Sequence, residues 1–203
     1  MSGRRVRLHG GWGRAALAAT VAALVAGCGA SGAGGTGKAL PASNGQMAQQ
    51  VQAGCIHSPV QVKMMGVETV PCKTESHVAE GKAVTYETDP PLSGDHWSSW
   101  LPPGFYTVAQ APEQLVHDLE HGNIVIYYDK DRLSADDLAK VKALTQQFRQ
   151  DFQGVLAVPR ADKQAALILT AWEHALRLNS YAPDAVDQFV DAFRGRGPEK
   201  AVR

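Results

Sequence analysis

Apolar and polar positions along the chain predict strands in several short runs. Ile124 to Tyr128 is a compact run of β-branched and aromatic residues, which is typical of a buried strand. Val60 to Val70, which a glycine interrupts, predicts two short strands, and Ala83 to Glu87 predicts another. Val155 to Val158 is a further strand. Ala165 to Leu178 is compatible with a helix or with strands, and we favour strands.

Apolar residues at helical spacing predict longer elements. Ala111 to His121 has a proline in its first turn and Gly122 directly after it, and both are typical of helix ends. Ser134 to Phe152 and Pro183 to Arg194 carry apolar stripes that one helix face can bury. Gln46 to Gln52 is a candidate for a short additional helix.

The stretch from residue 88 to residue 104 follows neither periodicity. It contains four prolines, two glycines and two tryptophans, which predicts an ordered loop. Together these patterns predict one α+β domain, in which a small, mainly antiparallel sheet packs with two or three helices.

The N-terminal residues have the pattern of an export signal. Four arginines and no acidic residue lie among residues 1–27, and Ala15 to Ala26 is apolar. Twelve apolar residues are too few to span a bilayer, which needs about 20, but they suit a signal peptide. Small residues directly before Cys28 resemble the bacterial lipobox. We therefore expect residues 1–27 to be a lipoprotein signal peptide and Cys28 to be lipidated.

The remaining chain is predicted to be a tether followed by a domain. Residues 28–45 are rich in Gly, Ala and Ser and predict a flexible tether, and residues 46–203 predict the single domain. Removing residues 1–27 leaves sixteen basic and twenty acidic residues, a net charge of about −4. No basic stripe is present, so we expect no nucleic-acid partner. The expected location is extracytoplasmic, with lipid on Cys28 as the membrane anchor, in an inner or an outer membrane.

Two cysteines remain after Cys28. In an oxidising compartment Cys55 and Cys72 predict a disulfide, and this pair would constrain the unfolded chain by roughly 3 kcal/mol. The alternative is a pair of thiolate ligands for a metal ion, which the absence of a Cys-x-x-Cys motif disfavours.

The densest chemical feature is His117-Asp118-Leu119-Glu120-His121. On a helix, His117 and His121 lie one turn apart and both imidazoles can bind one metal ion. The spelling H-x-x-E-H is also that of inverzincin metalloproteases, in which the glutamate is the general base. The competing interpretation is a polar helix end, where the helix dipole favours imidazolium.

His96 is the third candidate ligand. It lies in the proline-bounded loop, and rigid loops often carry functional residues. Convergence of His96 with His117 and His121 would complete a three-histidine site. The alternative is a histidine that packs beneath Trp97 and Trp100.

Several ordered blocks of the chain resemble an uncharacterised bacterial family, domain of unknown function number 3105. The blocks are Pro90-Pro91-x-Ser93-Gly94-x-His96, Gly104-x-Tyr106 and Val116-His117-x-Leu119-Glu120-His121-Gly122, with further similarity at His77-Val78 and Ala171-Trp172. The resemblance extends from about Gly66 to about Gly197. Family members often carry glycine after the tryptophan, where this chain has Glu173 and His174. The resemblance implies an extracytoplasmic, often membrane-tethered protein and implies no activity.

The leading hypothesis is a domain that binds zinc or copper. His96, His117 and His121 are the candidate ligands, His77 is a possible fourth, and Glu120 is either a ligand or a hydrogen-bond acceptor behind one of the imidazoles.

Two other hypotheses remain open. One is a zinc-dependent hydrolase in which Glu120 is the general base, although we regard an enzyme as the less favoured outcome. The other is a non-catalytic module that binds an envelope protein or glycan through an aromatic surface of Trp97, Trp100, Phe105 and Tyr106.

Overall fold

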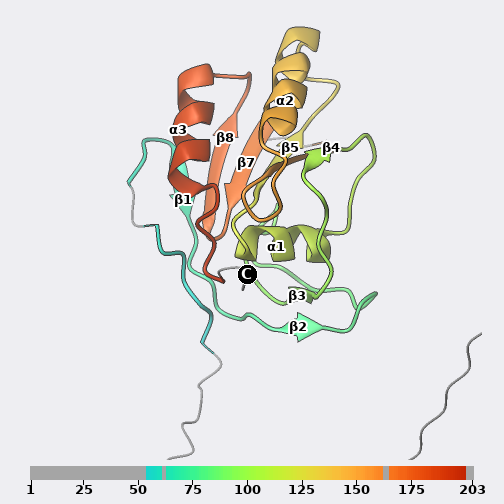
Figure 1. Ribbon diagram of the computed structural model, residues 1–203, viewed down its shortest axis with the longest axis vertical. Helices are drawn as coiled ribbons and strands as arrows, with labels where there is room; N and C mark the ends of the chain where they lie inside the picture. Colours follow the sequence, from blue (N-terminus) through green and yellow to red (C-terminus); the bar gives the residue numbers. More distant parts are fainter. Residues whose placement is uncertain (1–53, 61–62, 162–164, 200–203) are drawn as a thin grey trace, which may run out of the picture. The chain divides into compact units, whose positions relative to one another are not determined.

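The structure is a computed structural model that describes residues 54–60, 63–161 and 165–199 (Figure 1). All of these residues belong to one structural unit, Met47–Arg203. The predicted signal peptide, the tether and the candidate helix Gln46–Gln52 lie outside the described residues. Among the helices that are described, none is both long enough and apolar enough to cross a membrane.

A six-stranded sheet forms the centre of the domain, and a two-stranded sheet lies apart from it. The large sheet has the order β1-β8-β7-β5-β6-β4, and the small sheet pairs β2 with β3. The strands of the large sheet are β1 (Val67–Thr69), β4 (Gly104–Phe105), β5 (Ile124–Tyr128), β6 (Val155–Pro159), β7 (Leu167–Ala171) and β8 (His174–Leu178). The small sheet consists of β2 (His77–Val78) and β3 (His96–Trp97).

The large sheet is mostly antiparallel, as expected, but it is mixed, because two of its five strand pairings are parallel. Strands β1, β8, β7 and β5 pair antiparallel, but β5, β6 and β4 pair parallel. The reason is the connection after β5, which runs through helix α2 (Ala135–Gln147) before β6 begins. A strand that returns through a helical crossover runs parallel to the first strand, whereas a tight hairpin makes the pair antiparallel. The α+β class and the single domain agree with the prediction.

Alternating residues of the central strands face two different helical layers. Ile124, Ile126 and Tyr128 of β5 belong to the core that α2 and α3 (Pro183–Phe193) cover. Val125 and Tyr127 belong to the opposite core, which α1 (Pro112–Glu120) covers. Because successive strand residues point to opposite faces, a strand buried on both sides is apolar throughout. Figure 1 shows α2 and α3 above α1, which lies next to β2 and β3.

The three helices predicted within the described residues form, and one of them is shorter than expected. Helix α1 ends with His121 as its C-cap, followed by Gly122 at a φ of 99°. Helix α2 ends at Gln147, whereas the apolar stripe predicted a helix to Phe152. The Phe148 carbonyl accepts a hydrogen bond from Val155 N, so the chain already turns toward β6 there. Strands β7 and β8 confirm that residues 165 to 178 form strands.

In the first half of the chain, one strand prediction is right only in part and another is wrong. Of the described residues between Val60 and Val70, only Val67–Thr69 forms a strand. The stretch from Ala83 to Glu87 forms no strand, because its backbone is engaged elsewhere. Val84 N donates to a side-chain oxygen of Glu113 in α1 instead of to a neighbouring strand. The expected loop at residues 88–104 is a loop, apart from the two residues of β3 and the start of β4.

The chain after α3 packs tightly on the C-terminal end of α1. Gly195 N donates to the carbonyl of Gly122 at 2.7 Å, and Glu199 N donates to the carbonyl of Glu120 at 3.2 Å. A Cβ atom on Gly197 would overlap the backbone at Glu120, His121 and Gly122. Backbone contact this close requires glycine.

We expect Gly197→Ala to destabilise the fold because the added methyl group must push the tail away from α1. The free energy of unfolding, measured by urea denaturation, should fall by about 1–3 kcal/mol, the usual cost of overpacking. Gly104→Ala is the matched control, because the nearest atom to its Cβ would be the Pro102 carbonyl oxygen at 4.0 Å. Equal denaturation midpoints for the two variants would contradict this account of the tail.

Candidate metal centre

The small sheet places two histidines directly beside each other. Strands β2 and β3 are parallel, and their register pairs His77 with His96. Paired residues of neighbouring strands present their side chains on the same face of a sheet. His77 is exposed, whereas His96 has no exposed surface.

Helix α1 supplies the other two members of the cluster. It contacts β3 on one side and β5 of the large sheet on the other. His117 and Glu120 are three residues apart, so they lie on one face of the helix. Both are almost completely buried, with 3% and 2% of their surface exposed.

His77, His96, His117 and Glu120 form one compact group. Each offers a ligand atom, and these four atoms all lie within 4.8 Å of one another. The ring centroids of the three histidines are 4.9 to 5.2 Å apart. Ligands about 2.1 Å from a tetrahedral ion lie roughly 3.4 Å apart, so a small adjustment of these side chains would bring them to metal-binding distances.

Backbone carbonyls set the orientation of the two buried imidazoles. His96 Nδ1 lies 2.8 Å from the carbonyl oxygen of Gly94, and His117 Nδ1 lies 2.7 Å from that of Trp97. A carbonyl oxygen can only accept, so Nδ1 donates its hydrogen in both rings. Nε2 is then the nitrogen that each ring has available for the cluster. Metal-binding histidines are held by such hydrogen bonds from the other ring nitrogen.

His96 and Glu120 form a buried ion pair. His96 Nε2 and Glu120 Oε2 are 3.0 Å apart. Burial acts to lower the pKa of His96, but the hydrogen bond and charge of Glu120, together with the Gly94 carbonyl, raise it above its ordinary value. Burial likewise opposes ionisation of Glu120, but hydrogen bonds from His96 and Glu75 lower its pKa to about 2. The carboxylate is therefore charged at neutral pH.

His117 is neutral at physiological pH. Burial is the main cause that lowers its pKa to about 4, and the neighbouring His121 and His96 lower it further. The lone pair of Nε2 is therefore free of a proton, which is the form of imidazole that binds metal ions.

Glu75 is a neighbour of the cluster that sequence patterns gave no reason to expect. Its carboxyl group hydrogen-bonds to Glu120 and accepts a hydrogen bond from Ile56 N at 2.7 Å. Burial and the nearby Glu120 carboxylate raise the pKa of Glu75 to about 7. No periodicity links residue 75 to residue 120, so only the folded chain reveals this contact.

His121 lies beside the cluster, in a second group of possible ligands. Its ring is 4.6 Å from that of His117 and 4.4 Å from that of Phe152. Its ligand atom is grouped with those of Glu120 and Glu199, all within 4.8 Å. The structure thus brings together the sequence-predicted His96, His117 and Glu120, adds His77 as the fourth member, and places His121 in a group that shares Glu120.

The aromatic residues near the cluster pack mostly against the protein. Trp100 is 45% exposed and stacks on His117 at a centroid distance of 5.7 Å. Trp97 Nε1 donates to the Lys82 carbonyl, Phe105 stacks on Tyr128, and the Tyr106 hydroxyl donates to the Pro102 carbonyl. Trp100 therefore lies over the histidines, and the other rings have partners within the domain.

The first described segment of the chain is attached to the rest of the domain by a disulfide and by a buried carboxylate. Cys55 and Cys72 are joined by a disulfide, with their Cα atoms 5.6 Å apart. The Glu173 carboxylate accepts hydrogen bonds from Ser58 N and Cys72 N and pairs with His57 Nδ1 at 2.6 Å. These contacts fix the cysteine-containing segment on the turn between β7 and β8.

The turn that holds Glu173 places this residue in an unusual backbone conformation. Glu173 has a φ of 67°, which lies in the left-handed region that favours glycine. His174, the next residue, contacts Thr69 Oγ1 at 3.0 Å and packs on the Phe193 ring. It is not a member of either histidine group.

The comparisons with known proteins identify the family. The family described as "Protein of unknown function (DUF3105)" matches residues 77–203, more than half of the chain, and the chain belongs to this family. The match begins at His77 and includes all four residues of the cluster. No curated protein and no solved structure matches the chain.

We expect Glu120→Gln to lower the pKa of His96 in metal-free protein, because burial then acts without a compensating carboxylate. An imidazole ¹⁵N NMR titration in the presence of a chelator measures this pKa. Glu113→Gln is the control, since Glu113 is also a buried glutamate of α1 but pairs with Val84 N. A His96 pKa that does not change in Glu120→Gln would contradict the ion pair.

The pKa shifts of His96 and Glu120 determine the pH range in which the ion pair stabilises the fold. The pKa of His96 in the folded state is above its ordinary 6.5, so this contribution is complete below pH 6.5 and is lost as pH rises through the raised value. The pKa of Glu120 is below its ordinary 4.5, so its contribution is lost as pH falls from 4.5 to about 2. The pair therefore stabilises the fold most between pH 4.5 and 6.5.

Proposed function

We propose that this DUF3105 protein binds one transition-metal ion through His77, His96, His117 and Glu120, on an extracytoplasmic domain that lipid on Cys28 tethers to a membrane. The observation that most directly supports a metal site is the convergence of four potential ligands from β2, β3 and α1 within 4.8 Å. Three of them are buried.

The ligand atoms favour zinc or divalent copper. Three imidazole nitrogens and one carboxylate oxygen suit both ions, whereas monovalent copper prefers sulfur. Neither methionine near this part of the chain offers sulfur to the cluster. Met64 packs against the core that α2 and α3 cover, and the side chain of Met65 is 99% exposed.

Position within the fold also supports a cation site. Glu120 is the last residue of α1, so the cluster lies at the C-terminal end of this helix. The helix dipole places partial negative charge at that end, which favours a cation. Glu120 adds a full negative charge, because its pKa is held near 2.

The role of Glu120 distinguishes a site that only binds metal from the active site of a hydrolase. If Glu120 is a ligand, the four side chains fill a tetrahedral ion and leave no position for a water nucleophile. If Glu120 is instead a general base, the three histidines bind the ion and one position stays open. We favour the ligand role, because Glu120 Oε2 lies as close to His96 Nε2 as two ligands of one ion.

We expect the full chain, purified from membranes without a polyhistidine tag, to contain about one equivalent of zinc or copper by elemental analysis. His77→Gln should reduce affinity by more than the roughly 10–100-fold that loss of an outer hydrogen-bond partner costs. His77 is exposed, so this variant should fold normally, which circular dichroism will check. Glu120→Gln should also lose metal if Glu120 is a ligand.

His57→Gln is the matched control for the metal experiment. His57 pairs with a glutamate, as His96 does, but it lies outside the cluster. Its metal content should equal that of the unaltered protein. Protein without metal, or metal content that does not change in His77→Gln and Glu120→Gln, would refute the proposed site.

We expect Cys28→Ser to abolish lipid attachment, because the thiol is the acylated atom and a serine hydroxyl does not replace it. The variant should stay in its uncut precursor form and lack the mass of the lipid, as intact mass will measure. Ser31→Ala, three residues away, should be processed normally. Normal processing of Cys28→Ser would show that the lipoprotein interpretation is wrong.

A further inference from the structure

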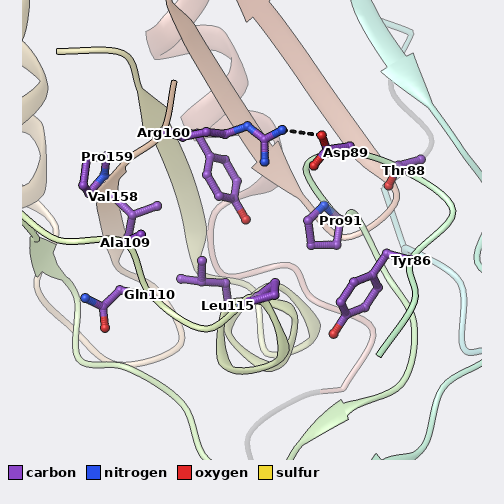
Figure 2. Close-up of a pocket in the computed structure, with 12 residues that line it drawn as sticks. Tyr86, Thr88, Asp89, Pro91, Ala109, Gln110, Leu115, Val158, Pro159 and Arg160 are labelled. Atoms are coloured by element: carbon purple, nitrogen blue, oxygen red, sulfur yellow. Dashed lines mark ion pairs between the residues drawn. The ribbon is translucent and has the colours of Figure 1, made fainter. Parts of the chain in front are cut away.

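A cavity of about 380 Å³ lies at the opposite end of α1 from the histidines. It is bounded by the loop at residues 86–91, the first turn of α1, and the ends of β5 and β6 (Figure 2). Strands β5 and β6 are parallel, and both reach the cavity with their carboxyl ends. Ligands of sheets that contain parallel strands commonly bind at this edge.

Most of the cavity wall is apolar. Figure 2 shows Pro91 and Leu115 facing the same hollow. The apolar lining residues are Pro91, Ala109, Pro112, Leu115, Val158 and Pro159. A volume of this size with an apolar wall and a few polar groups is typical of a site for a small organic molecule.

Tyr127 provides a buried hydroxyl group that has no partner. It lines the cavity from β5, and only 6% of its surface is exposed. Its hydroxyl makes no hydrogen bond to any other part of the described chain. Burial raises the pKa of this group above its usual range, so the hydroxyl keeps its proton and can donate. The hydroxyl itself is buried, so a hydrogen-bond acceptor reaches it from the cavity through a small shift of the lining side chains.

Arg160 adds a positive charge beside that hydroxyl. Its guanidinium lies 5.8 Å from the centre of the Tyr127 ring. It also pairs with Asp89, at 2.6 Å between Nη2 and Oδ2, as the dashed line in Figure 2 shows. Asp89 also lines the cavity, although 81% of its side chain is exposed.

The end of α1 nearest the cavity also favours negative charge. Ala111 is the N-cap residue, and no side chain caps the first turn. The N-terminal end of a helix carries partial positive charge. With a buried donor, a guanidinium and a helix N-terminus at one apolar cavity, the preferred acceptor is a carboxylate.

We propose that this cavity binds a small monocarboxylate with an apolar carbon skeleton, at a site independent of the metal centre. The carboxylate accepts the hydrogen bond of Tyr127 and lies near Arg160, where it competes with Asp89. The carbon skeleton packs against the prolines and Leu115.

The experiment uses 2-naphthoate as the probe, with its fluorescence followed during titration into the full chain. We expect saturable binding at one site and weaker binding of 2-naphthamide, the uncharged analogue. Tyr127→Phe should weaken naphthoate binding about tenfold, which corresponds to the loss of one hydrogen bond to a charged group. Asp89→Asn should strengthen it, because a competing carboxylate is removed.

Tyr128→Phe is the matched control for Tyr127→Phe. The adjacent hydroxyl of Tyr128 already donates to the Tyr106 carbonyl at 2.7 Å, and its ring belongs to the core on the other face of the sheet. This variant should bind naphthoate like the unaltered protein. Because the Tyr127 hydroxyl has no protein partner, Tyr127→Phe should fold normally.

A second test asks whether naphthoate binds to a metal ion instead of to the cavity. Binding should persist in the presence of a chelator and in His77→Gln, which would lack the metal ion. The proposal is overturned if a chelator abolishes binding, if Tyr127→Phe binds as tightly as the unaltered protein, or if naphthamide binds equally well. Failure of the metal proposal leaves each of these outcomes unchanged.

Discussion

The polar residues of a buried helix impose the constraint on which this structure depends. Helix α1 lies between the two sheets, and four of its nine residues are both polar and buried: Glu113, His117, Asp118 and Glu120. Each needs a partner that the helix itself does not supply. One partner of each comes from residues 84–101, which have little regular structure. These partners are Val84 N for Glu113, Trp97 O for His117, Leu101 N for Asp118 and the His96 ring for Glu120.

These pairings explain how a loop without long strands can hold a site rigidly. The same hydrogen bonds that satisfy α1 position β3, and β3 in turn aligns β2 by register. The chain after α3 then covers the C-terminal end of α1 with its Gly197. Histidines on short strands are therefore held by a helix and a tail, and not by the strands alone. Such support from neighbouring elements is what a metal site needs.

The two ends of α1 offer opposite electrostatic environments. The C-terminal end faces three imidazoles and a carboxylate, which favour a cation, and the N-terminal end faces an apolar cavity with Arg160 and a buried hydroxyl. The helix dipole has the matching sign at each end. One short helix thus contributes to a proposed metal site and to a proposed carboxylate site. Because no residue that lines the cavity belongs to the histidine cluster, the two proposals can fail separately.

Sequence by itself determined the elements whose signals are local. The five-residue run of β5, the ends of α1 at Pro112 and Gly122, and the i, i+3 placement of His117 and Glu120 follow from neighbouring residues. Tertiary structure decided what depends on distant pairs. The register of His77 with His96, the choice of His77 over His121 as the group's fourth member, and the contact of Glu75 with Glu120 join segments that no periodicity connects. The parallel pairing of β5 and β6 likewise depends on the path of α2, because strand direction is a property of the connection and not of the strand residues.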